Sequence, residues 1–177
     1  MLEYSKELAE RIGEYLQNQG WHCEFNEDTG IYTFGLNLRN KMKTIRMYIG
    51  VRVGGFSVYG VSLVNADEEN IGKVMEYFTR VNYGLKYGNF EIDLRDYEVR
   101  FKCAHFCGDE LPSMDEVETS IDMPYFMWSQ YGDGYLSMLF SDESPEEAVE
   151  KAETTQDEEA PQDEDAEQGE ETASTEK

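Results

Sequence analysis

The sequence predicts an α+β domain, in which an antiparallel sheet carries helices against one face. The hydrophobic period switches between the helical value near 3.6 and the strand value of 2, and the strand-like segments are neighbours joined by short turns. The predicted order is helix, four strands, helix, two strands, helix. We divide the chain into a domain over residues 1–141, a short acidic helix or linker over 142–153 and a disordered acidic tail over 154–177.

The N-terminal half reads as one helix followed by a four-stranded meander. The helix is predicted over residues 2–18, with its apolar residues on one face and a glycine just after it. Alternating apolar residues then predict strands, the first of them over 21–25. Gly54 and Gly55 can take the positive φ that a tight hairpin needs. We interpret Gly60 as a β-bulge, because the apolar face changes there.

The second half reads as helix, hairpin and helix. Residues 65–69 are expected to open the second helix with acidic side chains at its positive end, and Gly84 to end it. After the hairpin, a capping box at Ser113 begins a third helix. Pro124 is expected to kink or end this helix, and residues 132–134 to end the piece that follows.

The charge of the chain is concentrated at its C-terminal end. The chain has 38 acidic and 15 basic residues, and 16 of the acidic residues but only two lysines lie from Ser141 onward. After Val149 there is no Val, Ile, Leu, Met or aromatic residue, so burial cannot offset the entropy of ordering the tail. Ser144, Pro145 and Glu147 nevertheless predict a short helix that reaches about residue 153.

Charge, cysteines and hydropathy narrow the classes of function. An acidic surface does not suit nucleic-acid phosphate, although the tail itself could act as a decoy that mimics nucleic acid. No segment approaches the roughly 20 apolar residues of a membrane span, and the first residues lack the positive charge of a signal peptide. Three cysteines do not suit a disulfide framework. We therefore expect a cytoplasmic protein that binds neither membrane nor nucleic acid.

The segment RVNYGLKYGNFEID joins the second helix to the hairpin. Asn82 tolerates left-handed geometry and can satisfy a free backbone group at the helix end. Gly84 and Gly88 allow the chain to reverse, and we expect Phe90 to fill the space between the helix and the sheet. The segment is therefore predicted to be a structural corner.

This corner and the order of elements resemble the YbjN-like family of bacterial proteins over about residues 4–140. Val81-Asn82, Leu85, Gly88, Phe90 and the strand EVRFKC carry the resemblance. It implies a fold like that of type III secretion chaperones and a role as a sensory-transduction regulator. The family has no agreed catalytic residues, so the resemblance assigns none to this chain.

Cys103, His105 and Cys107 form the most chemical pattern in the chain. On a regular strand they would share one face, and His22 and Cys23 are conceivable partners. Zinc needs about four ligands in a tetrahedral array, whereas alternate strand residues lie roughly 7 Å apart. The three residues are therefore only weak metal candidates, and a buried Cys with His105 near the strand edge is the default. We expect no cofactor.

The aromatic residues after Pro124 are the candidate protein-binding site. Tyr125, Trp128 and Tyr131 would share one helical face, and such residues are enriched at interface hot spots. The competing interpretation is that they pack back onto the sheet. We predict a non-enzymatic protein-binding, adaptor or chaperone-like module that could be regulatory and homodimeric. The alternatives are a small metal-binding or thiol-dependent enzyme using Cys103, His105 and Cys107, and an acidic decoy.

Overall fold

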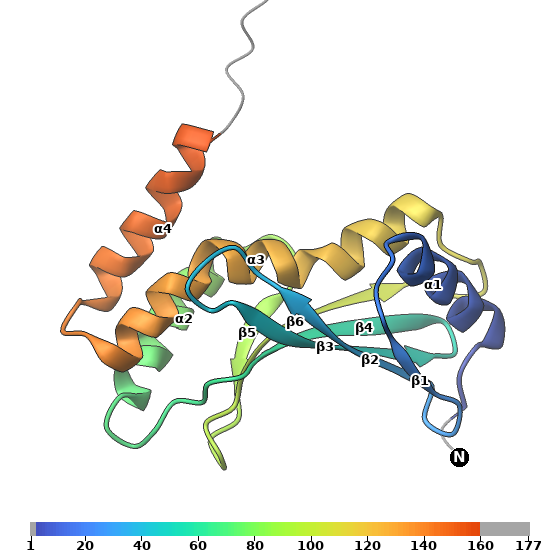
Figure 1. Ribbon diagram of the computed structural model, residues 1–177, viewed down its shortest axis with the longest axis horizontal. Helices are drawn as coiled ribbons and strands as arrows, with labels where there is room; N and C mark the ends of the chain where they lie inside the picture. The colour runs from blue at the N-terminus through green and yellow to red at the C-terminus, as the bar shows by residue number, and fades with distance from the viewer. Residues whose placement is uncertain (1–2, 160–177) are drawn as a thin grey trace, which may run out of the picture.

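The computed structural model describes residues 3–159 and confirms the α+β class. Within them, four helices accompany an open, six-stranded antiparallel sheet, and α1, α2 and α3 lie on one side of it (Figure 1). In chain order the elements are α1 Lys6–Asn18, β1 Glu24–Asn26, β2 Ile31–Asn37, β3 Thr44–Arg52, β4 Gly55–Ser62, α2 Ile71–Gly84, β5 Asn89–Ile92, β6 Val99–Phe106, α3 Met114–Phe140 and α4 Pro145–Glu159.

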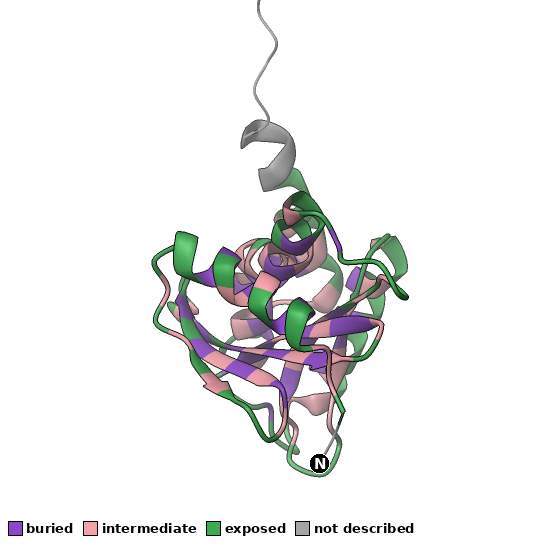
Figure 2. Cartoon of the chain, turned by 90° about the vertical axis from the view of Figure 1, so that its right-hand side faces the viewer, coloured by how far each residue is buried: buried purple, intermediate pink, exposed green. Residues whose placement is uncertain are grey.

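The strands lie in the order β1-β2-β3-β4-β6-β5, and every neighbouring pair is antiparallel. Buried and half-buried positions alternate along them (Figure 2), as expected for a sheet with one covered face. The predicted bulge at Gly60 is wrong, because Gly60 pairs with Met47 in an uninterrupted ladder. A Cβ at Gly60 would lie 2.7 Å from the Cβ of Pro124, so this glycine instead lets α3 approach the sheet.

Helix α3 is a single helix of 27 residues, which corrects two expectations. Pro124 lies inside it without ending it, and the glycines at 132 and 134 do not end it either. Both glycines serve close packing: a Cβ at Gly132 would lie 2.7 Å from the Met42 side chain, and one at Gly134 would overlap the Tyr77 hydroxyl. Tertiary contacts therefore determine the length of this helix and override the local helix-ending signals.

Three element starts differ from the predicted ones. Helix α1 begins at Lys6, where the Ser5 side chain caps it. The Asp67 side chain accepts hydrogen bonds from the N–H groups of Glu69 and Asn70, so this stretch is a turn and α2 begins only at Ile71. Strand β1 covers Glu24–Asn26 rather than 21–25.

The predicted corner between α2 and β5 is confirmed. The Asn82 side chain accepts the N–H of Phe90 at 2.8 Å and donates to its carbonyl at 2.9 Å, which ties the end of α2 to β5. Gly88 has φ +71°, and a Cβ there would lie 2.5 Å from the Phe101 ring. Phe90 is buried and stacks on Phe78 of α2 at 4.4 Å.

Helix α4 extends beyond its predicted end. It follows the predicted cap at Ser144 and reaches Glu159, whereas the predicted helix ends near residue 153. Ala148 is buried, and the Gln130 side chain of α3 donates to the Ala152 carbonyl at 3.4 Å. The first turns of α4 are thus part of the domain. The rest of the predicted tail, 160–177, lies outside the described residues, as does most of the candidate decoy.

Because of these contacts, removing α4 and removing only the residues after it should affect the melting temperature differently. Ending the chain after residue 159 should leave the melting temperature unchanged, because the removed segment has no large apolar side chain. Ending it after Asp142 should lower the melting temperature by several degrees, because the partners of Ala148 are then exposed. Equal melting temperatures for the two truncated chains would contradict this account.

Candidate functional site

The structure corrects the predicted aromatic binding site. Trp128 and Tyr131 are buried, and Tyr125 is half-buried, so these side chains do not form spare surface. The indole N–H of Trp128 donates to the Gly60 carbonyl of β4 at 2.8 Å, and the Tyr131 carbonyl accepts the Tyr77 hydroxyl at 2.9 Å. Because Pro124 does not interrupt α3, the apolar stripe continues to face the sheet. The competing interpretation, packing onto the sheet, is the one observed.

Cys103, His105 and Cys107 do not converge on one point. The Cys103 thiol donates to the Ser120 carbonyl of α3 at 3.2 Å, and the His105 ring stacks on Phe56 at 5.5 Å. Cys107 follows the end of β6, so it does not continue the alternation of the strand. Among residues 3–159, no group of three His, Cys, Asp or Glu side chains could hold a metal ion.

The three cysteines should differ in reactivity. Burial raises the pKa of the Cys103 thiol to about 12, so it stays protonated at neutral pH and is a poor nucleophile. Cys23 and Cys107 are only half-buried. A chromogenic disulfide reagent should therefore titrate at most two thiols quickly in the native protein and three after unfolding. Rapid reaction of Cys103 in the folded protein, located by peptide mapping, would contradict this placement.

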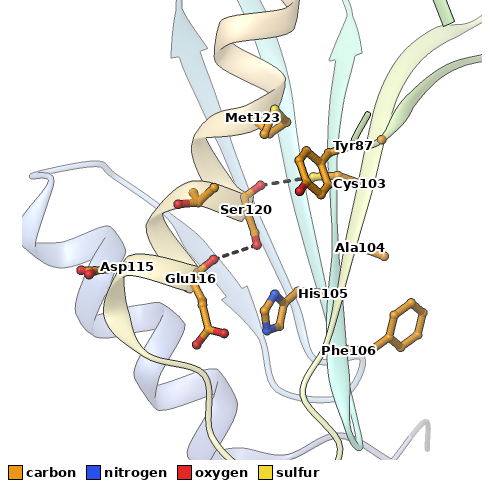
Figure 3. Close-up of a pocket in the computed structure, with 11 residues that line it drawn as sticks. Tyr87, Cys103, Ala104, His105, Phe106, Asp115, Glu116, Ser120 and Met123 are labelled. Carbon is orange, nitrogen blue, oxygen red and sulfur yellow. Dashed lines mark hydrogen bonds between the residues drawn. The ribbon is translucent and has the colours of Figure 1, made fainter. Parts of the chain in front are cut away.

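The same stretch of β6 lines an apolar groove of about 510 Å³, here called the β6 groove. Its walls are the edge of β6, the first half of α3 and the loop before β5, and its lining is mostly apolar (Figure 3). The lining residues are Tyr87, Gly88, Cys103, Ala104, His105, Phe106, Asp115, Glu116, Thr119, Ser120 and Met123.

The edge of β6 that borders this groove has no strand beside it. β5 pairs only with residues 99–102 of β6, so among residues 3–159 no strand pairs with 103–106 on the side away from β4. The cause is Gly88, whose positive φ turns the chain away just before β5. Four residues of β6 are therefore paired on one side only.

The direction of the backbone groups follows from their neighbours. The Lys102 carbonyl lies close to Gly88 beside β5, whereas the His105 carbonyl and the Cys107 N–H lie toward the β3–β4 hairpin. Backbone groups alternate between the two sides of a strand. Ala104 and Phe106 therefore direct their N–H and C=O groups to the uncovered side.

Two exposed aromatic side chains flank the groove. Phe106 is 87% exposed on the open face of the sheet, and Tyr87 is 72% exposed at the opposite end. Large apolar side chains at this exposure, next to an apolar hollow, are typical of an interaction surface. The pattern Cys103-x-His105 lies on this strand, but its residue types do not indicate that the strand edge is unpaired. The sequence signal for it is the short run of four residues between Gly88 and the Asp93–Asp96 turn.

Neither a protein-family model nor a curated protein matches this chain. Over the part of the chain that the structure describes, no helix is long and apolar enough to cross a membrane.

Proposed function

We propose that this protein is a non-enzymatic protein-binding module that holds an extended segment of a partner as an added strand on β6. One observation carries the proposal: residues 103–106 present unpaired backbone groups beside an apolar groove. Exposed strand edges recruit extended peptides through main-chain hydrogen bonds, and pockets beside the edge select the side chains. The resemblance to chaperone-like YbjN proteins points in the same direction.

The size of the free edge sets the expected strength. Ala104 and Phe106 offer up to four backbone hydrogen bonds, each worth about 0.5–1.5 kcal/mol net. One apolar side chain buried in the groove would add about 1.5–3 kcal/mol. Ordering the peptide and docking it offset part of this gain. We therefore expect dissociation constants in the micromolar range, on the order of those of transient interactions.

The chemistry of the lining residues supports binding over catalysis. A thiol nucleophile needs a lowered pKa or a base within hydrogen-bond reach, whereas burial raises the pKa of Cys103 to about 12 and its thiol donates to a carbonyl. His105 is stacked on Phe56 instead of directed at that thiol. The alternative of a thiol-dependent enzyme on this strand therefore has less support.

A library of phage-displayed random nonapeptides, selected on the immobilised full chain, tests the proposal. Selected peptides should bind wild type with micromolar dissociation constants. Ala104→Pro should weaken them at least about tenfold, because proline removes the N–H on the uncovered side and leaves the β4 ladder intact. Ala104→Ser is the matched control, since it keeps the N–H and should bind like wild type.

A second measurement leaves the protein unchanged. Methylating the backbone nitrogens of a selected peptide at alternate positions removes its donors, and one of the two alternations should abolish binding while the other should not. A library that yields no binder would refute the proposal. The proposal would also be refuted if the selected peptides bound Ala104→Pro as tightly as wild type and both methylated peptides bound wild type as tightly as the unmodified peptide.

A further inference from the structure

We infer that the segment taken up by the β6 groove carries an apolar residue and, two positions away, a Lys or Arg, which rests on the function proposed above. The groove has two chemically different ends on the side that faces α3. One end is apolar and the other is acidic, and their separation along β6 is one strand repeat.

The apolar end lies at Cys103. The side chains of Cys103, Met123 and Tyr87 line this end of the groove, with Met123 on α3 above the other two in Figure 3. The polar atoms at this end are already satisfied, because the Cys103 thiol donates to the Ser120 carbonyl. A partner side chain that enters here meets carbon and sulfur without a free hydrogen-bond partner. Only an apolar side chain enters without the loss of its own hydrogen bonds to water.

The acidic end lies at His105. Figure 3 shows the Glu116 side chain of α3 beside the His105 ring, whereas the Asp115 side chain points away from this ring. Hydrogen bonds from the N–H and hydroxyl of Ser113 lower the pKa of Glu116, so this carboxylate is ionised at neutral pH. Two acidic and no Lys or Arg side chains line the groove. A cationic side chain is the complement of this end.

The spacing comes from the strand geometry. Cys103 and His105 are two residues apart on β6, and side chains on one face of a strand repeat roughly every 7 Å. An added strand has the same repeat. When one of its side chains enters the apolar end, the side chain two positions away lies beside Glu116.

Charge also decides between the possible occupants. The residues from 160 onward include seven acidic side chains and one lysine, so the chain's own C-terminal segment would bring negative charge to Glu116. A second copy that paired β6 with β6 would bring its own Glu116 to this rim. The acidic rim of the groove repels both of these acidic occupants and attracts a basic segment from another protein.

The selection described above, sequenced in full, tests this inference. Pools selected on wild type should be enriched in Lys or Arg two positions from an apolar residue. Changing that basic residue to Gln should weaken binding about three- to tenfold, and the loss should shrink at high salt.

Glu116→Gln removes the charge but retains the capping-box acceptor. Pools selected on this variant should lose the basic residue. Glu118→Gln, an exposed position on the same helix outside the groove lining, is the matched control and should select the same pools as wild type.

The outcomes separate this inference from the proposed function. Peptides that fail on Ala104→Pro but show no basic preference would overturn the inference and leave strand addition standing. If no peptide is selected, both fall. A full-chain dimer that Ala104→Pro dissociates would make a second copy the occupant. Binders that appear only after removal of residues 160–177 would make the chain's own segment the occupant. Either result overturns the inference.

Discussion

Trp128→Ala should destabilise the domain by about 3–5 kcal/mol, the range for truncating a buried aromatic side chain. Trp128 is one of the largest fully buried side chains and packs edge-on against Phe78, Phe90 and Tyr135. Its indole N–H is the partner of the Gly60 carbonyl. The substitution therefore opens a cavity between α3 and the sheet and removes a buried side-chain hydrogen bond to β4.

Chemical denaturation followed by circular dichroism measures this loss. Phe126→Ala is the control, because Phe126 lies two residues earlier on α3 and its side chain is 55% exposed. We expect a change of at most about 0.5–1 kcal/mol for it. If the two variants were equally stable, Trp128 would not be a core residue and the aromatic stretch after Pro124 would again be a candidate surface.

Phe90→Ala should also cost about 3–5 kcal/mol. The ring fills the space where α2, α3 and the sheet meet: it stacks on Phe78 at 4.4 Å and meets Phe101 and Trp128 edge-on at 5.1 and 5.0 Å. Asn82 fixes the backbone of Phe90 from the end of α2, so the backbone cannot readily shift to refill the cavity.

The exposed aromatic Tyr83, on the same helix as Asn82, provides the control. Its side chain is 95% exposed, and Tyr83→Ala should leave the free energy of unfolding within about 0.5 kcal/mol. Thermal melts of both variants test the pair. A small loss for Phe90→Ala would mean that the corner is held by the Asn82 hydrogen bonds alone, which Asn82→Ala would then show.

Features set by local chemistry were predictable from the sequence, as the corner illustrates. Asn82, Gly88 and Phe90 lie within nine residues, and each has a role that its own side chain dictates. The caps at Ser113 and Ser144 are local in the same way. Such signals act over one turn of chain and do not depend on what packs against it.

The predictions from sequence were wrong where contacts between distant segments determine the structure. Gly134 reads as a helix stop but is needed for the close approach of Tyr77, which lies 57 positions earlier in the chain. Whether the stripe of Trp128 and Tyr131 faces the sheet depends on α3 crossing Gly60, a contact that no local pattern indicates. The candidate site is of this kind, because an unpaired edge depends on where the neighbouring strand begins.

The metal or thiol site that the sequence pattern suggested on β6 depended on the side chains of Cys103 and His105 being available. Cys103 and His105 alternate correctly for a strand and share its α3-facing side, as expected. Their side chains have other partners: Ser120 for the thiol and Phe56 for the ring. The unpaired groups on this strand are the backbone N–H and C=O groups of Ala104 and Phe106. The side chains of these two residues give no sequence signal for a binding site.

Amide hydrogen exchange measured by NMR tests strand addition most directly. In the free protein, the amides of Cys103 and His105 should exchange slowly because they face β4, and those of Ala104 and Phe106 should exchange quickly. A saturating selected peptide should slow Ala104 and Phe106 at least about tenfold, with little change at the exposed amides of α2. Protection of Ala104 and Phe106 before any peptide is added, or no gain in protection when a peptide binds, would contradict strand addition at β6.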